Sequence, residues 1–329
     1  MKKALILGVT GQDGSYLADI LLEKGYAVYG MVRRSATGNT RNIRHLLDDE
    51  EIFGSRFFVK RGDLADPVSL HRIIEEVEPD EIYNEADQDH VSWSFDIVGY
   101  SADITGAAVG RVLEIIRQVN PKIRFFQPCS SNMFGLTEAR VQNEETPFNP
   151  QSTYAVSKVT AYYFTRYYRQ AFGMHASAAI LYNHESPRRA IEYLSRKVSN
   201  GIARIKLGKQ RKLALGDTSA KIDWGHAREY MEAAWAMLQQ PTADDYVIAT
   251  GEVHSVQDFV ELAFRCAGLN SVDHVVQDRS LLRPTKTSTL VGDASKAKAA
   301  FGFAPKIRLP DLVKAMVEAD MALESGRST

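Results

Sequence analysis

The sequence predicts an α/β fold, a doubly wound parallel sheet followed by a smaller α/β substrate-binding region. Over residues 1–182, short β-rich runs alternate with helical segments, which is typical of a parallel sheet covered by helices. A glycine-rich turn joins the first of these runs to the first helical segment. After about residue 183 charges cluster and the elements become shorter. We therefore expect a region 1–182 that carries the main sheet. We expect region 183–329 to close over it, with some strands and helices free to return to the first region.

Each element is predicted from apolar runs and their spacing. The first strand is a short apolar run that ends at Gly8, and the first helix places Leu17, Ile20 and Leu21 on one face before Gly25 ends it. The later elements repeat this alternation in order. The expected strands are 4–7, 27–32, 56–60, 81–83, 123–126 and 176–182, and the expected helices are 15–24, 69–77, 102–118 and a segment around 154–170.

Composition narrows the class of protein. The 329 residues carry 40 Lys and Arg against 41 Asp and Glu, a net charge of -1. Such a balance offers no general attraction for nucleic acid or for an anionic membrane. No apolar run approaches the roughly 20 residues that span a bilayer. Cys129 and Cys266 are too few for a disulfide framework, and the histidines lack the close spacing of a helical metal site. We expect a cytoplasmic protein without a metal, a membrane contact or a nucleic-acid partner.

The turn 8–14, GVTGQDG, carries a glycine at every third position. A backbone without Cβ lets a pyrophosphate approach the N-terminus of the following helix, where free N–H groups and the helix dipole favour negative charge. Between a strand and a helix this pattern predicts a Rossmann-type dinucleotide site. A glycine-rich turn without a ligand is the alternative. The prediction assigns the cofactor to Gly8, Thr10, Gly11, Gln12, Asp13 and Gly14.

The ends of the second and third expected strands bear on the choice of cofactor. The second ends in Arg33 and Arg34, which suit the 2′-phosphate of NADP, whereas NAD sites usually place an acidic residue there. NADP is therefore favoured over NAD, and solvated loop charges are the alternative. After the third strand, Asp63 either reaches the adenine amine or caps the helix that follows. Both interpretations stay open.

Tyr154 and Lys158 stand at i and i+4, so a helix would place a phenol and an ammonium on one face. One unit charge about 6 Å away at an effective dielectric of about 20 is worth roughly 3 kcal/mol, which would lower the pKa of a phenol from near 10 to about 8. Such a phenol can exchange a proton with a carbinol near operating pH. Tyr193 and Lys197 repeat the spacing, but they lie beyond the sixth expected strand. We therefore assign the catalytic role to Tyr154.

Together these residues resemble the extended short-chain dehydrogenase/reductase superfamily. Longer stretches, spread over nearly the whole chain, are similar to the GDP-mannose 4,6-dehydratase family. The resemblance implies a GDP-sugar substrate, tightly held NADP, and a homodimer or homotetramer. The matching stretches are 8–17 (GVTGQDGSYL), 32–35 (VRRS), 183–189 (NHESPRR), 203–208 (ARIKLG), 223–226 (DWGH) and 245–252 (DYVIATGE).

The resemblance also implies a reaction. The hexose is oxidised at C4, with Tyr154 as base, Ser130 bonding the C4 oxygen and Lys158 on the ribose. A glutamate then removes the C5 proton and helps to expel the C6 hydroxyl as water, and hydride returns to C6. The same resemblance adds Leu64 and Ala86 to the cofactor site. It places the substrate on Asn183, Arg189, Lys197, Leu207, Gly216, Lys221 and Arg283.

The chain departs from the family pattern at the position of that glutamate, where it has Asn132. An amide cannot cycle a proton at neutral pH, and a missing general base costs about 10²–10⁴ in rate. Ile222 stands where the family has an arginine against the nucleotide phosphates, and Lys286 stands where it has a glutamate. These departures favour an enzyme that stops at C4 chemistry, a 4-epimerase.

Two other interpretations remain open. Asp87 and Asp89 follow the fourth expected strand, where the family is mostly small or apolar. One of them could replace the missing base and preserve dehydration, although helix capping and loop solvation would also account for them. The last interpretation is a nucleotide-bound sensor without catalysis, against which the intact Tyr154, Lys158 and Ser130 argue.

Overall fold

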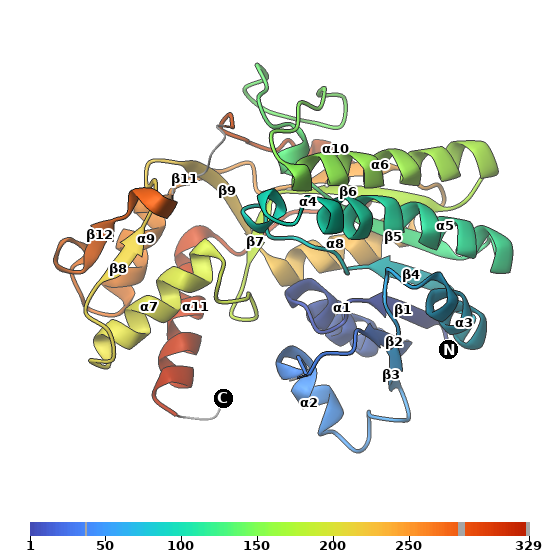
Figure 1. The fold of residues 1–329 in the computed structure, drawn as a ribbon, viewed down its shortest axis with the longest axis horizontal. Coiled ribbons are helices and arrows are strands. Elements are labelled where there is room, and N and C mark those ends of the chain that lie inside the picture. Colours follow the sequence, from blue (N-terminus) through green and yellow to red (C-terminus); the bar gives the residue numbers. More distant parts are fainter. Residues whose placement is uncertain (37, 282–286, 327–329) are drawn as a thin grey trace.

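A computed structural model describes residues 1–36, 38–281 and 287–326. Its centre is a seven-stranded sheet in the order β10-β6-β5-β4-β1-β2-β3, in which every pairing is parallel (Figure 1). The order reverses direction between β1 and β4, so the sheet is doubly wound and the predicted fold class is confirmed. The strands are β1 (Lys3–Leu7), β2 (Ala27–Val32), β3 (Phe57–Arg61), β4 (Glu81–Asn84), β5 (Arg124–Ser130), β6 (Ala176–Leu181) and β10 (Asp245–Ile248).

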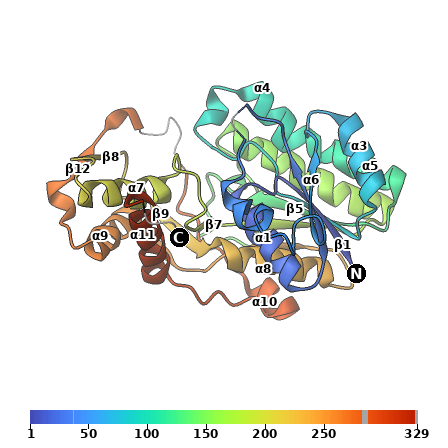
Figure 2. The ribbon, with the colours of Figure 1, turned by 90° about the horizontal axis from the view of Figure 1, so that it is seen from below.

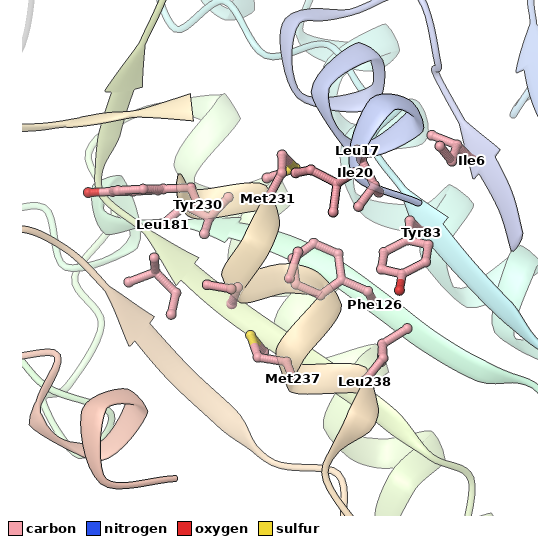
Figure 3. Close-up of a cluster of buried hydrophobic side chains, with 14 of the residues drawn as sticks. Ile6, Leu17, Ile20, Tyr83, Phe126, Leu181, Tyr230, Met231, Met237 and Leu238 are labelled. Atoms are coloured by element: carbon pink, nitrogen blue, oxygen red, sulfur yellow. The ribbon is translucent and has the colours of Figure 1, made fainter. Parts of the chain in front are cut away.

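Helices cover both faces of the sheet, because successive strand side chains point to opposite faces. On β1, Ala4 and Ile6 belong to one buried cluster, while Leu5 and Leu7 belong to another. Figure 3 shows the first cluster, where Met231 and Met237 lie among side chains of the strands and of the first helix. The helices around the sheet are α1 (Gln12–Glu23), α2 (Arg44–Leu47), α3 (Pro67–Val77), α4 (Val98–Ser101), α5 (Ala108–Val119), α6 (Thr153–Phe172), α8 (Ala227–Gln239) and α10 (Ser295–Phe301).

The helix ends follow local capping chemistry. Asp66 accepts hydrogen bonds from the backbone N–H groups of Val68 and Ser69, so it caps α3, and Pro67 occupies the first turn. The alternative that Asp63 caps this helix is therefore wrong. A π-helical turn, Ala102–Ala107, leads into α5.

The remaining elements form a smaller part beside the sheet (Figure 2). It has its own buried cluster, to which α7, α9 and α11 all contribute. The chain returns from it twice to the large sheet, first with α8 and β10 in succession and later with α10. Its helices are α7 (Leu194–Lys206), α9 (Val256–Cys266) and α11 (Leu309–Glu324), and its strands are β7 (Asn183–Glu185), β8 (Leu213–Leu215), β9 (Lys221–His226), β11 (Val253–Ser255) and β12 (Val275–Gln277).

Across the described ranges, no helix combines the length and the apolar character that crossing a bilayer requires.

Candidate active site

A cleft of about 410 Å³ opens at the carboxyl ends of the parallel strands. This edge is where open α/β sheets bind ligands, because the loops after the strands converge there. The cleft is lined by nearly all of the predicted cofactor residues. Gly14 is not in the lining but packs against the backbone of Gly8 in the same turn. The predicted residues in the lining are Gly8, Thr10, Gly11, Gln12, Asp13, Arg33, Asp63, Leu64, Ala86, Tyr154 and Lys158.

The glycine turn is packed too closely for side chains. Gly8 has φ +84°, and a Cβ there would lie 2.6 Å from the carbonyl oxygen of Glu85. A Cβ on Gly14 would lie 2.5 Å from the carbonyl oxygen of Gly8. Helix α1 begins directly after Gly11, and no side chain caps its N-terminus. This end of the cleft therefore fits an anionic group such as a pyrophosphate.

The residues at the next two strand ends also face the cleft. Arg33 donates a hydrogen bond from Nη1 to the hydroxyl of Tyr100, at 2.7 Å, which holds its guanidinium at the cleft. Asp63 accepts a hydrogen bond from the backbone N–H of Ala65, at 3.0 Å. Both side chains thus line the cleft at the ends of β2 and β3.

Tyr154 and Lys158 lie one turn apart on α6, and both are buried in the lining of the cleft. The Lys158 Nζ atom lies 5.7 Å from the centre of the Tyr154 ring. Ser130, at the end of β5, hydrogen-bonds to the phenol oxygen. The structure therefore brings the phenol, the ammonium and the serine hydroxyl together, as a proton-transfer site requires.

The second tyrosine–lysine pair has different surroundings. Tyr193 precedes α7, and the guanidinium carbon of Arg189 lies 3.6 Å from the centre of its ring. Lys197 does not line the cleft. This pair is not the proton-transfer site.

The expected low pKa of Tyr154 is wrong for this structure. Burial raises the pKa of Tyr154 to about 12, and the lysine only partly offsets that rise. At 5.7 Å an unopposed ammonium is worth roughly 3 kcal/mol at an effective dielectric of about 20. Here it is opposed, because the Asp87 carboxylate lies 2.6 Å from the Lys158 Nζ atom.

Asn132 follows Ser130 and turns back towards it. The Asn132 amide donates a hydrogen bond from Nδ2 to the Ser130 Oγ atom at 3.1 Å, and its backbone N–H donates to the same oxygen at 3.2 Å. Two donors on that oxygen leave Ser130 its own proton to donate, here to the phenol oxygen of Tyr154. Asn132 thus orients Ser130 and supplies no base.

The carboxylates of Asp87 and Asp89, which follow β4, contact basic side chains of the cleft and do not cap helices. Asp87 pairs with Lys158, and Asp89 lies 3.7 Å from an Arg189 nitrogen. Glu85, which sequence reasoning did not single out, also lines the cleft. Its Oε1 atom is buried without a hydrogen-bond partner among the described residues. Burial, followed by the neighbouring Asp13, raises the pKa of Glu85 well above its usual value.

Replacing Glu85 by Gln should make the protein more stable at higher pH. The folded state holds the proton of Glu85 more tightly than the unfolded chain does, so stability falls as the pH rises above the unfolded value near 4.5. Glutamine mimics the neutral acid and abolishes this fall. We expect the free energy of unfolding to rise by about 1–3 kcal/mol near pH 8 and to change little near pH 4.

Urea unfolding of both proteins from about pH 4 to about pH 8 measures this difference. The exposed Glu51→Gln variant removes the same charge elsewhere and serves as the control. A constant difference between Glu85→Gln and the parent at every pH would contradict a protonated Glu85.

His184 is a second residue in the cleft that the sequence did not single out. Its Nε2 atom lies 2.9 Å from Asp13 Oδ2, and its Nδ1 atom lies 2.8 Å from the carbonyl oxygen of Tyr182. Burial alone lowers the pKa of His184, but Asp13 outweighs it and the net shift is upward. The pair ties the start of α1 to β7. Its only sequence signal is that Asn183 and His184 follow the sixth strand, whose carboxyl end faces the cleft.

Of the predicted substrate residues, Arg189 alone lines this cleft among the part of the chain that the structure describes. Its Nε atom lies 3.3 Å from Glu185 Oε2. Asn183 begins β7, Leu207 directly follows α7 as its C-cap, Lys221 begins β9, and Gly216 approaches the carbonyl oxygen of Leu281. Arg283 lies outside the described residues, as does Lys286.

Within the described ranges, no three His, Cys, Asp or Glu side chains are grouped so that they could hold a metal ion.

Solved structures share this architecture. RMD from Pseudomonas aeruginosa, complexed with NADPH, superposes with a TM-score of 0.81 at 20% identity and covers 98% of this chain and 100% of its own. A dTDP-glucose 4,6-dehydratase from Bacillus anthracis, complexed with NAD, gives 0.83 at 21% identity, over 99% of this chain and 98% of its own. At such identities the likeness concerns the fold. With Tyr154 and Lys158 beside the glycine turn, the fold is that of an extended short-chain dehydrogenase/reductase.

The sequence comparisons are more specific. The family model for GDP-mannose 4,6 dehydratase matches residues 5–316. GDP-mannose 4,6 dehydratase 1 of Arabidopsis thaliana is 46% identical over 98% of this chain and 90% of its own length. The human GDP-mannose 4,6 dehydratase is 42% identical over 97% of this chain and 91% of its own length. The chain belongs to the GDP-mannose 4,6-dehydratase family and is an NAD(P)-dependent nucleotide-sugar-modifying enzyme.

Proposed function

We propose that this enzyme oxidises the hexose of a GDP-sugar at C4 and then eliminates water across C5 and C6. The observation that carries the proposal is the proton-transfer site of Tyr154, Lys158 and Ser130 in the cleft of the glycine turn. The family match over residues 5–316 extends it from C4 oxidation to dehydration. This reverses the order of preference drawn from Asn132 and the other departures from the family pattern, because relatives that align over nearly the whole chain are named as dehydratases.

The proposed cofactor is NADP. The uncapped N-terminus of α1 would hold its pyrophosphate, Arg33 its 2′-phosphate and Asp63 its adenine, while Lys158 would hold the ribose next to the reacting ring. When bound, the nicotinamide accepts and later returns the hydride. NAD remains the second choice, since Arg33 is what favours the 2′-phosphate.

The side chains divide the proton transfers between them. Tyr154 takes the proton of the C4 hydroxyl while Ser130 donates a hydrogen bond to the C4 oxygen. The resulting 4-keto group acidifies the proton on C5. A carboxylate then removes that proton and delivers it to the C6 hydroxyl, so that the C6–O bond breaks and water leaves. C6 then takes back the hydride and C5 takes up a proton.

Asp89 is the carboxylate that we assign to this second proton transfer. Asp87 lies against Lys158 at 2.6 Å and its side chain is 15% exposed, whereas the Asp89 side chain is 48% exposed at the same cleft. Of these two, Asp89 is the one open enough to meet a bound hexose. Arg189, 3.7 Å from it, would face the substrate diphosphate.

One specific observation favours a second candidate function, a 4-epimerase. Asn132 occupies the position at which the family pattern has its catalytic glutamate, and its amide is engaged with Ser130. Such an enzyme would oxidise C4, let the keto-sugar turn over, and return the hydride to the other face. Asn132 would then act only through the orientation of Ser130.

Product mass separates the two functions. We expect incubation with GDP-mannose to yield a product lighter by one water, and Asp89→Asn to lower the rate of water loss by about 10²–10⁴ while C4 oxidation continues. Asp103→Asn is the matched control, because it removes a carboxylate that does not line the cleft, and it should keep water loss. A product of unchanged mass would establish the epimerase, and no change in nicotinamide absorbance with any GDP-sugar would indicate a sensor.

We also propose a homodimer or homotetramer. The outer face of α6 exposes Val156, Tyr163 and Tyr167, each with more than half of its surface open. Their spacing places them along one face of the helix. An exposed strip of one apolar and two aromatic side chains is typical of a surface that another subunit covers.

A further inference from the structure

The Lys158 ammonium has an unusual counter-ion for a site that must ionise a neighbouring phenol. Its Nζ atom lies 2.6 Å from Asp87 Oδ2 and donates a hydrogen bond of 2.7 Å to the carbonyl oxygen of Pro128. The lysine side chain is 4% exposed and the aspartate side chain 15% exposed. A buried pair of this kind is held in one geometry, because separating it would leave an unpaired charge out of water.

Asp87 also alters the electrostatic field at Tyr154. The groups that face the phenol are Lys158 on its own helix, Asp87 and Asp89 after β4, and Ser130 after β5. Of these, Lys158 favours the phenolate, and Ser130 does so through a hydrogen bond. The two aspartates disfavour it. Glu85, beside Asp87 in the cleft, adds charge only where it is ionised.

Resting on the proposed function, we propose that Asp87 is a positioning residue for C4 oxidation. It anchors Lys158 against the Pro128 carbonyl and cancels much of the ammonium charge at Tyr154, so that proton transfer from the sugar requires more alkaline solution. The lysine keeps one N–H for a ribose hydroxyl, because an ammonium has three and the described residues engage two of them.

The first test is the pH dependence of hydride transfer. Single-turnover oxidation of GDP-mannose is followed by nicotinamide absorbance in the parent, Asp87→Asn and Asp87→Glu proteins. Asp87→Asn keeps a hydrogen-bonding oxygen but loses the charge. We expect the midpoint of its pH–rate profile to lie lower by at least about one pH unit, so that the rate of hydride transfer near neutral pH rises about tenfold. Asp87→Glu retains the charge and should keep the parental profile.

A matched control removes a carboxylate elsewhere. Asp103 pairs with Arg111 at 2.6 Å and does not line the cleft. Asp103→Asn should leave the pH profile where it is. A shift as large as that of Asp87→Asn would overturn the proposal, because the loss of any one negative charge from the protein would then account for it. Thermal unfolding of each variant shows that it is folded.

A second readout does not depend on activity. The titration of Tyr154 is obtained as the difference in tyrosinate absorbance between each protein and its Tyr154→Phe counterpart. Without added cofactor or sugar, Asp87→Asn should lower the midpoint of this titration by about one pH unit. In a Lys158→Met background, the shift of this midpoint caused by Asp87→Asn should differ in size, because the Asp87–Lys158 pair no longer exists there.

The two readouts separate failure of this inference from failure of the proposed function. If no GDP-sugar is oxidised but the phenol midpoint still shifts, the proposed function is wrong, and what stands is the electrostatic effect of Asp87 on Tyr154. If oxidation occurs and neither the pH profile nor the phenol midpoint moves in Asp87→Asn, then the role of Asp87 is refuted.

Discussion

Replacing Tyr154 by Phe should lower hydride transfer from a GDP-sugar by about 10²–10⁴-fold. The substitution removes one hydroxyl oxygen, the atom that Ser130 hydrogen-bonds and that lies on the ammonium side of α6. Without it, no group at this position accepts the C4 proton. The measurement is the appearance of reduced nicotinamide in a single turnover with GDP-mannose.

Binding and folding should survive this substitution. Phenylalanine fills the same buried volume, so dinucleotide affinity should change far less than the rate. Tyr163→Phe, on the same helix but 55% exposed, is the matched control and should keep parental activity. Parental rates in Tyr154→Phe would remove the basis of the proposed function, because the proton acceptor would then have to be another group.

Asp320→Ala should cost about 3–5 kcal/mol of unfolding free energy. Asp320, on α11, is completely buried and pairs with Arg196 on α7. The Arg196 Nη2 atom lies 2.6 Å from Asp320 Oδ1, and Nε donates a hydrogen bond of 2.7 Å to Oδ2. Ser199 donates a further hydrogen bond to it at 2.6 Å. Removing the carboxylate leaves the guanidinium of Arg196 buried without its counter-ion, and that penalty is larger than the loss of the pair itself.

The same substitution should weaken the substrate side of the cleft. Arg196 donates hydrogen bonds to the backbone carbonyl oxygens of Pro187 and Arg189, which hold the segment that carries the Arg189 side chain. Chemical denaturation measures the stability, with Glu318→Ala as the control. Glu318 lies on the same helix in an exposed pair with Lys314, 3.9 Å away, and should change stability by less than about 1 kcal/mol. Equal losses in both variants would contradict the buried-pair argument.

Most of the main sheet could be predicted from local patterns. The strand 27–32 has the bounds of β2, and the other five predicted strands lie within a few residues of those observed. Local patterns succeed here because a parallel strand is an apolar run between turns. They fail for β10, a four-residue strand that pairs with β6 although some sixty residues separate them. That pairing depends on tertiary packing.

The candidate site could be predicted in outline. The glycine turn and the Tyr154–Lys158 pair were identified because both depend on short spacings within one element. The roles of Glu85, Asp87 and His184 could not be read in this way. Each depends on a partner from another part of the chain: Glu85 on Asp13, Asp87 on Lys158 and His184 on Asp13.

The sequence by itself determined the fold class, the glycine turn between the first strand and the first helix, and the placing of Tyr154 and Lys158 one turn apart on a helix. The tertiary structure decided how that phenol is tuned, because electrostatic interactions depend on distance and burial rather than on separation along the chain. Sequence spacing places Lys158 beside Tyr154 and so predicts a lowered pKa for the phenol. Only the fold places Asp87 against Lys158, where its negative charge offsets that effect.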